Sequence, residues 1–252
     1  MEKQTHNLTI VSVSKSYSLS KCKDGPALRA LDNISFHLSN GLYGLLGPNG
    51  SGKSTLINII TGNLAPDEGV VFWDNNPIMQ QGKEFRKILG YVPQQQNLYD
   101  GFTGQRFLQY ICVLKDIPHT YIQKEVNRVA EKVNLIDELN KRISAYSGGM
   151  KQRLLAAAAM IGYPKLLILD EPTAGLDPKE RVRYRDMMKM YSKHAIILFA
   201  THVVSDIENV ADGIILLKKG KVALAGSPKE LITQVSGCNG LEELYLSVFG
   251  NT

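Results

Sequence analysis

The sequence predicts an α/β fold built on a sheet with parallel strands, into which a helical segment is inserted. Two short apolar runs, Leu166–Leu169 and Ile196–Phe199, have the uninterrupted apolar character of parallel strands buried on both faces. A third apolar run, Gly41–Leu46, is followed at once by a segment of helical pattern. Residues 95–163 then place apolar residues at spacings of three and four, which indicates helices.

The N-terminal elements are expected to be strands. Alternating apolar and polar residues at Leu8–Val13 predict a half-buried strand, and Ile34–Leu38 predicts a second one. The polar stretch Ser18–Gly25 between them has the composition of a surface loop. Val70–Trp73 is a further strand candidate, and the turn Asp74–Pro77 follows it.

The later elements alternate between helices and strands. Helical periodicity or alanine content predicts three helices in the inserted segment, at Phe102–Lys115, Tyr121–Val133 and Met150–Ile161. Near the C-terminus, the sequence predicts a hairpin and a helix. The hairpin joins Ile214–Leu217 to Lys221–Ala225 around Lys219-Gly220, and the amphipathic helix spans Leu241–Phe249.

Composition sets limits on the class of protein. The chain has 252 residues, 44% hydrophobic and 21% charged, as in ordinary globular proteins. Its net charge of +5 is not concentrated in any run of like charges, so we expect no nucleic-acid partner. No apolar stretch has the length of a signal peptide core or a membrane helix. If the protein serves a membrane, we therefore expect another chain to supply the membrane spans.

The cysteines give little sign of covalent or metal cross-links. Cys22, Cys112 and Cys238 are odd in number, far apart and form no CxxC pair, so they predict neither a disulfide framework nor a zinc site. Free thiols fit a reducing compartment.

A glycine-rich loop follows the strand Gly41–Leu46 and carries the strongest functional pattern. Residues 47–54 match G-x-x-x-x-G-K-[ST] in full, between a strand and a helix. Glycines let backbone N–H groups approach a triphosphate, and the helix that begins near Lys53 adds its positive end. We expect Lys53 to reach the β- and γ-phosphates and Ser54 to ligate Mg²⁺. The predicted nucleotide-binding residues are Gly47, Pro48, Asn49, Gly50, Ser51, Gly52, Lys53, Ser54 and Thr55.

Two carboxylates follow the apolar strand Leu166–Leu169. The carboxyl edge of a parallel sheet is where α/β folds bind ligands, and this places Asp170 and Glu171 there. We expect Asp170 to hold Mg²⁺ through water and Glu171 to polarise the water that attacks the γ-phosphate.

Further segments follow in an order similar to that of ABC ATPases. Tyr146–Met150, hereafter the signature segment, resembles the family motif usually written LSGGQ. Other matching residues are Tyr17 at the adenine-stacking aromatic, Gln94 at the Q-loop, Asp177 in the D-loop region Pro172–Pro178, and His202 at the switch histidine. The resemblance covers nearly the whole chain, from about Leu8 to Gly226.

This resemblance implies a P-loop NTPase core of mixed β-sheet with flanking helices and an N-terminal antiparallel β-subdomain. It implies one ABC ATPase domain, whose core is residues 1–94 and 164–226. The helical part is 95–163 and a short C-terminal helical extension is 227–252. The implied cofactors are ATP and Mg²⁺, with Gln94 beside the metal ligands Ser54 and Asp170. The implied catalytic residues are Glu171, His202, Lys53 and Gln94.

The resemblance also implies partners. Ser147, Gly148 and Gly149 should open a helix whose free N–H groups bind an anion. In the family this surface meets the γ-phosphate held by a second ATPase subunit, so each chain holds half of a site. Family members power transport through a transmembrane permease on a separate chain, at the cytoplasmic face of the membrane.

The signature segment departs from the usual pattern at two positions. Tyr146 and Met150 replace the usual Leu and Gln, and Met150 lacks the polar side chain of that glutamine. This form, together with Pro172–Pro178 and the ending Leu241–Leu246, is similar to bacterial exporter-type ATPase subunits, so export is the expected direction.

Two other classes of protein share part of this pattern. A soluble ABC ATPase, such as an iron–sulfur assembly subunit, shares the same motifs. A small-molecule kinase is disfavoured because it would need neither Ser147–Gly149 nor His202. Within the transporter reading, residues in Asn97–Gln109 are expected to line a groove for the membrane subunit. The apolar residues Phe102, Phe107, Tyr110, Ile111 and Leu114 can face either the core or that partner.

Overall fold

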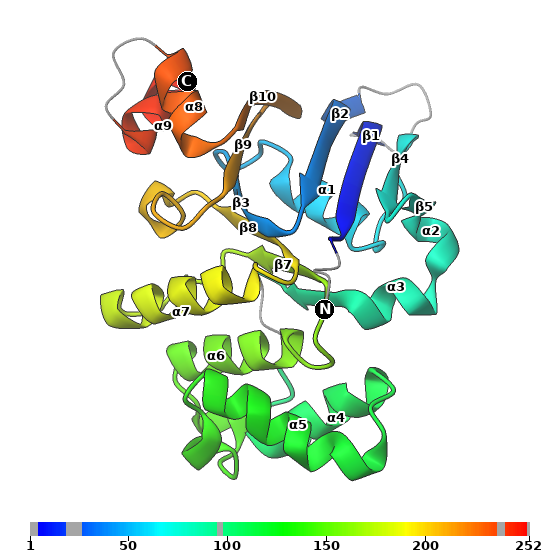
Figure 1. The fold of residues 1–252 in the computed structure, drawn as a ribbon, viewed down its shortest axis with the longest axis vertical. Coiled ribbons are helices and arrows are strands. Elements are labelled where there is room, and N and C mark those ends of the chain that lie inside the picture. Colours follow the sequence, from blue (N-terminus) through cyan, green and yellow to red (C-terminus); the bar gives the residue numbers. More distant parts are fainter. Residues whose placement is uncertain (1–4, 19–26, 95–97, 236–239, 251–252) are drawn as a thin grey trace.

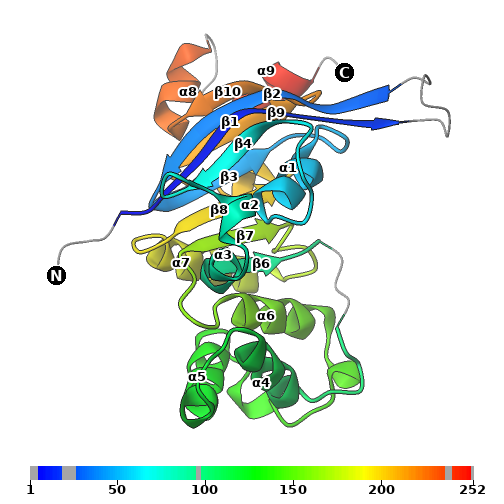
Figure 2. The same ribbon diagram turned by 90° about the vertical axis from the view of Figure 1, so that its right-hand side faces the viewer.

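The computed structural model describes residues 5–18, 27–94, 98–235 and 240–250. Within these residues the chain forms two sheets, a group of helices at one end, and a pair of C-terminal helices at the other (Figure 1). Figure 2 shows the helices α4 (Gly104–Leu114), α5 (His119–Lys132) and α6 (Gly148–Ala159) grouped at one end of the molecule, where α6 packs against the nearer sheet. The predicted α/β class with an inserted helical segment is confirmed.

The smaller sheet is antiparallel, with strand order β2-β1-β4-β5. Its strands are β1 (Asn7–Ser18), β2 (Ala27–Ser39), β4 (Glu68–Trp73) and β5 (Asn76–Pro77). β1 and β2 are longer than predicted because they continue pairing past register shifts between Ile10 and Ser16. The prediction that Ser18 begins a loop was wrong, since it is the last residue of β1; residues 19–25 of that loop lie outside the described residues.

The larger sheet contains the strands that lead into the predicted site residues. Its order is β10-β9-β3-β8-β7-β6, and all neighbours are parallel except β10, which is antiparallel to β9. The strands are β3 (Gly41–Leu46), β6 (Leu89–Val92), β7 (Leu166–Asp170), β8 (Ile196–Thr201), β9 (Gly213–Lys218) and β10 (Lys221–Gly226). Every residue of β7 and β8 is buried, as their apolar runs predicted.

The predicted helices are present, with shifts of at most two residues at either end. Thr103 and Ser147 accept hydrogen bonds from Arg106 N and Met150 N, and these caps fix the starts of α4 and α6. The remaining helices are α1 (Lys53–Ile60), α2 (Ile78–Gln81), α3 (Lys83–Ile88), α7 (Pro178–Tyr191), α8 (Pro228–Gln234) and α9 (Leu241–Phe249). Short 3-10 turns lie at Ile136–Glu138, Ile143–Ala145 and Val204–Asp206.

The larger sheet divides the apolar interior into two clusters. Along β7, Leu166 and Ile168 belong to the cluster shared with α1 and the smaller sheet. The alternate residues Leu167 and Leu169 belong to the cluster shared with the helical part. Strands β3, β8 and β7 end side by side at Leu46, Thr201 and Asp170. Because helices or the smaller sheet cover both faces of the larger sheet, ligands are expected at these carboxyl ends of the strands.

Candidate functional site

A cleft of about 500 Å³ opens at this carboxyl edge. It gathers most of the residues that the sequence predicts for nucleotide binding: Tyr17, Asn49, Gly50, Ser51, Gly52, Lys53, Ser54, Thr55, Gln94, Asp170 and Glu171. It also includes five residues that sequence reasoning missed: Leu28, Arg29 and Ala30 from β2, and Lys219 and Gly220 from the β9–β10 turn. Gly47, Pro48, Asp177, His202 and the residues of the signature segment are not among its lining.

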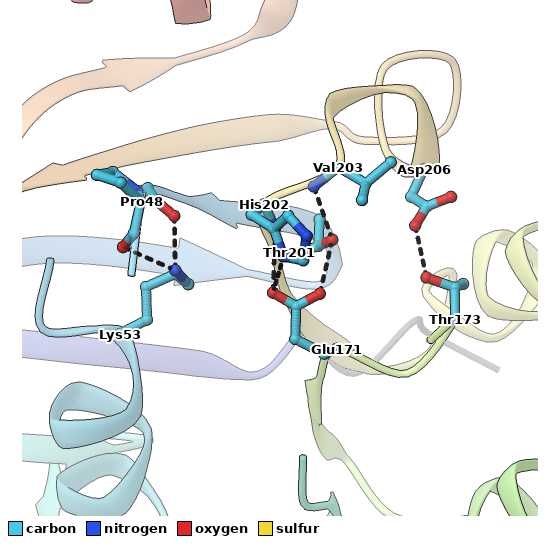
Figure 3. Close-up of polar contacts among 9 residues, drawn as sticks. Pro48, Lys53, Glu171, Thr173, Thr201, His202, Val203 and Asp206 are labelled. Atoms are coloured by element: carbon cyan, nitrogen blue, oxygen red, sulfur yellow. Dashed lines mark hydrogen bonds and ion pairs between the residues drawn. The ribbon is translucent and has the colours of Figure 1, made fainter. Parts of the chain in front are cut away.

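The loop Gly47–Thr55, hereafter the phosphate loop, connects β3 to α1. Lys53 is 8% exposed, and its Nζ donates to the carbonyls of Gly47 at 2.6 Å and Pro48 at 3.2 Å (Figure 3). Burial lowers the pKa of Lys53, and the carboxylates of Glu171 and Asp170 oppose that effect. These hydrogen bonds hold the ammonium group within the loop. Phosphate oxygens can take the place of the two carbonyl oxygens as acceptors.

Two glycines let three segments meet beneath the phosphate loop. A Cβ on Gly52 would lie 2.6 Å from the carbonyl oxygen of Ala30, and one on Gly220 would lie 2.7 Å from it. Both glycines also have positive φ, at 107° and 78°. The Gly220 N–H donates to the Ser51 carbonyl at 2.9 Å. This tertiary contact brings the β9–β10 turn and β2 to the cleft, and no local pattern in the sequence signals it.

Asp170 lies at the end of β7 and is only 4% exposed. Burial and the neighbouring Glu171 carboxylate raise its pKa to about 6, although Lys53 acts in the opposite direction. A further cation that enters the cleft would stabilise the charged form of this buried carboxylate.

Glu171 and His202 contact each other at the carboxyl edge of the larger sheet. Nδ1 of His202 lies 2.7 Å from Oε1 of Glu171, and the His202 backbone N–H donates to the same oxygen at 3.1 Å (Figure 3). Thr201 Oγ1 donates to Oε2 at 3.2 Å. Glu171 has φ of 48°, a conformation uncommon for residues other than glycine, and its backbone N–H is held by the Ala200 carbonyl. The side chain of Glu171 is therefore fixed, whereas that of His202 is 59% exposed.

The cleft offers hard oxygen ligands for a divalent cation. Ser54, Gln94 and Asp170 all line it, and hydroxyl, amide and carboxylate oxygens suit Mg²⁺. Among the described residues, no group of three or more His, Cys, Asp or Glu could hold a metal ion alone. This donor set fits a Mg²⁺ that shares its coordination with substrate phosphates and water.

The signature segment lies outside the cleft of its own chain. Ser147 caps α6 and, like Gly148, is exposed, and a Cβ added to Gly148 would meet no heavy atom within 4 Å. Asp177 is also exposed and caps α7 by accepting from Glu180 N at 2.8 Å. Two capped helix N-termini thus face outward, where they can meet an anion on another molecule.

The two departures in the signature segment have different surroundings. Tyr146 is buried, and its hydroxyl donates to the Glu138 carbonyl at 2.8 Å. A Cβ on Gly104 would lie 2.2 Å from that hydroxyl, so the tyrosine fits because α4 begins with glycine. Met150 is half-buried against the apolar cluster of the helical part. Both side chains pack into the helical part and leave Ser147 and Gly148 free.

Comparisons with known proteins agree with this arrangement. A family profile described as ABC transporter matches residues 31–174. The chain is 38% identical over 216 residues to the uncharacterized ABC transporter ATP-binding protein YxlF of Bacillus subtilis, covering 85% of this chain and 72% of that protein. It is 36% identical to the Nod factor export ATP-binding protein I of Rhizobium etli, covering 83% of this chain and 67% of that protein.

A solved structure with a similar fold is a dimer. It is the post-hydrolysis state of the ATP-binding cassette MJ0796 bound to ADP and Pi, with a TM-score of 0.78 at 25% identity, covering 87% of this chain and 98% of that one. In the described part of the chain, no helix is both long and apolar enough to cross a lipid bilayer.

Proposed function

The chain belongs to the ATP-binding proteins of the ABC transporter family, and we propose that it completes its catalytic site only by pairing with a second ATPase subunit. One observation carries this proposal. The exposed N-terminus of α6, at Ser147 and Gly148, does not line the cleft that holds Lys53 in the same chain. A helix N-terminus that binds phosphate must therefore be offered to the cleft of another subunit.

The cleft provides the grip on the triphosphate. Lys53 exchanges its bonds to the carbonyls of Gly47 and Pro48 for oxygens of the β- and γ-phosphates. Tyr17, which is 41% exposed at the end of β1, offers a ring on which adenine stacks. Ser54, Gln94 and Asp170 would hold Mg²⁺, which supplies neutralising charge for the phosphates when bound.

Hydrolysis is assigned to Glu171 and His202. Glu171 accepts a proton from the attacking water. The water oxygen bonds to the γ-phosphorus, the bond from that phosphorus to the bridging oxygen breaks, and ADP and phosphate are the products. His202 holds the Glu171 carboxylate in place before ATP arrives, and its exposed ring can then turn toward the γ-phosphate.

ATP also acts as a clamp between the two subunits. A nucleotide held by the phosphate loop of one chain and by Ser147–Gly149 of the other favours the dimer by its differential affinity for that state. Asp177 lies at the start of α7 and faces outward, so it belongs to the same contact. Hydrolysis removes the bridging γ-phosphate, and the dimer opens.

Transport requires a membrane subunit, and an aromatic patch on the helical part is the proposed contact. Tyr99, Phe102 and Tyr110 pack together, with the Tyr99 ring 5.1 Å from Phe102 and 5.9 Å from Tyr110. Tyr99 and Tyr110 are still 52% and 40% exposed. Phe107, by contrast, is buried and Leu114 is exposed, so the apolar residues of this segment divide between core and surface. We propose that a short cytoplasmic helix of the membrane subunit covers the patch, which would place the chain at the cytoplasmic face of the membrane as part of an exporter.

Purification of the native complex tests this function. The tagged chain, drawn from detergent-solubilised membranes, should bring down a multi-span membrane protein, whereas recovery of a soluble assembly partner instead would favour the iron–sulfur assembly reading. Tyr110→Asp should lower that recovery, whereas Tyr121→Asp, on the exposed side of α5, should leave it unchanged. Equal recovery of the membrane protein with both variants would show that the aromatic patch is not its contact.

A further inference from the structure

The C-terminal helix α9 connects the segment that carries His202 to the strand that leads into one wall of the cleft. One end of α9 contacts the segment His202–Glu208, hereafter the switch segment, and its other end contacts Lys218, which precedes the turn at Lys219 and Gly220. We propose that α9 is a strut that holds the switch segment in place, and that Glu208 is a positioning residue for hydrolysis because it joins α9 to this segment.

The N-terminus of α9 is capped from the switch segment. Its own N-cap residue is Gly240, which has no side chain to accept a hydrogen bond. Oε1 of Glu208 instead accepts from the backbone N–H of Leu241, the first residue of α9, at 3.1 Å. A carboxylate at this position satisfies a free N–H and also interacts favourably with the positive end of the helix.

Apolar packing strengthens the same junction. Leu241 and Leu244 on α9 are fully buried, and they belong to one apolar cluster with Val204 and Ile207 of the switch segment. The Tyr245 ring follows on the same helix. Burial raises the pKa of its hydroxyl, and the Glu171 carboxylate acts in the same direction.

The C-terminal end of α9 is bound to β9, the strand that leads to Lys219 and Gly220 in the wall of the cleft. Lys218 Nζ donates to the carbonyl of Val248 at 2.5 Å and lies 5.9 Å from the centre of the Phe249 ring. A cation here complements the negative end of a helix. Lys218 is the last residue of β9, and Gly220 two residues later donates to the Ser51 carbonyl of the phosphate loop. The strut therefore spans from the switch segment to the wall that supports the phosphate loop.

The other side of the switch segment is held by α7 and by the chain before it. Thr173 Oγ1 donates to Asp206 at 2.5 Å, and Arg185 donates to the Ser205 carbonyl at 2.5 Å. With α9 on one side and these groups on the other, the backbone that follows His202 is fixed on both sides. Removal of the α9 contact leaves His202 with more freedom, so the productive geometry with Glu171 is populated less often.

Variants at Glu208 separate the hydrogen bond from the charge. In Glu208→Gln the amide oxygen can still accept from Leu241 N, whereas Glu208→Ala loses the acceptor. Glu242→Ala removes an exposed carboxylate from the first turn of the same helix and serves as the matched control. We expect Glu208→Ala to lower kcat for ATP hydrolysis about three- to ten-fold while KM stays within about two-fold. Glu208→Gln and Glu242→Ala should stay close to the unmodified chain.

Hydrogen exchange on the same proteins completes the test. Glu208→Ala should speed amide exchange in residues 203–211 and leave the phosphate loop unchanged. An unchanged kcat in Glu208→Ala, or a fall accompanied by faster exchange throughout the larger sheet, would overturn the inference. The inference rests on the proposed role of His202, which His202→Ala tests separately. Normal ATP hydrolysis by His202→Ala would contradict the proposed role of His202. Normal hydrolysis by Glu208→Ala together with slow hydrolysis by His202→Ala would support the role of His202 and contradict the role of α9 as a strut.

Discussion

The Glu171 carboxylate lies 2.7 Å from Nδ1 of His202, across the ends of two neighbouring strands, β7 and β8. The same carboxylate accepts from Thr201 Oγ1 and from the His202 backbone, so it is oriented before any nucleotide is present. This preorganisation supports its assignment as the general base, since a base that is already fixed needs little rearrangement in the transition state.

Loss of the Lys53 ammonium should weaken nucleotide binding itself. Lys53→Ala removes the buried cation that meets the β- and γ-phosphates, and we expect the Kd for ATP to rise about 10- to 100-fold. Equilibrium binding of a fluorescent ATP analogue measures this change. Lys124→Ala, on an exposed position of α5, is the matched control and should bind like the unmodified chain. Normal affinity in Lys53→Ala would contradict the proposed grip.

Asp170 should make the nucleotide-free protein less stable as the pH rises. Its folded-state pKa is raised from 3.8 to about 6, so its contribution to stability is present below about pH 4 and is lost as the pH rises through about 6. With a chelator present, Asp170→Asn should raise the free energy of unfolding at pH 8 by up to about 3 kcal/mol, and the gain should disappear near pH 4.

Denaturant unfolding at several pH values measures this effect. Asp137→Asn, at an exposed position, controls for the loss of one negative charge. Addition of Mg²⁺ and ATP should stabilise the unmodified chain more than Asp170→Asn, because the carboxylate then has a cation to meet. Equal stability of the two proteins at pH 8 would show that Asp170 is not strained in the empty cleft.

Gly148 should tolerate a side chain in the isolated chain but not in the ATP-bound dimer. A Cβ there meets nothing within 4 Å, and an aspartate in the first turn of α6 suits the helix N-terminus. Gly148→Asp should therefore fold and bind ATP normally. Its carboxylate would repel the γ-phosphate held by the other subunit, so hydrolysis should fall by at least about ten-fold.

Gly149→Ala offers an informative contrast within the same motif. Its Cβ would lie 2.9 Å from Oε2 of Glu180, whose Oε1 lies 3.3 Å from Nε of Arg153, so the Glu180 side chain must shift and its pairing with Arg153 is weakened. We expect this variant to lower the melting temperature, which Gly148→Asp should not. Normal hydrolysis by Gly148→Asp would argue against a composite site.

The parts of the site that could be predicted are those encoded within one short segment. The phosphate loop, the acids at the end of β7 and the cap at Ser147 each depend on neighbours in sequence, and the structure has all three. Strands β7 and β8 were predictable because burial on both faces requires uninterrupted apolar residues.

The features that were missed depend on contacts between distant segments or on weak local patterns. The turn at Gly220 reaches the phosphate loop only through tertiary packing on Ser51 and Ala30. Helix α7 was not predicted because only Tyr184 and Met188 of its 14 residues are buried. Two buried positions are too few to give the sequence a recognisable apolar periodicity. β6 was missed because it has four residues and includes Gly90.

The central claim is that ATP closes a dimer around two composite sites and that hydrolysis opens it. Glu171→Gln keeps the shape of the side chain but removes the base, so it should bind ATP normally and hydrolyse it at least about 100-fold more slowly. Light scattering after size-exclusion chromatography should then give the mass of a dimer for Glu171→Gln with Mg²⁺ and ATP. The same variant with Mg²⁺ and ADP should give the mass of a monomer. A Glu171→Gln protein that stays monomeric with saturating ATP, or that hydrolyses ATP at the normal rate, would contradict the account.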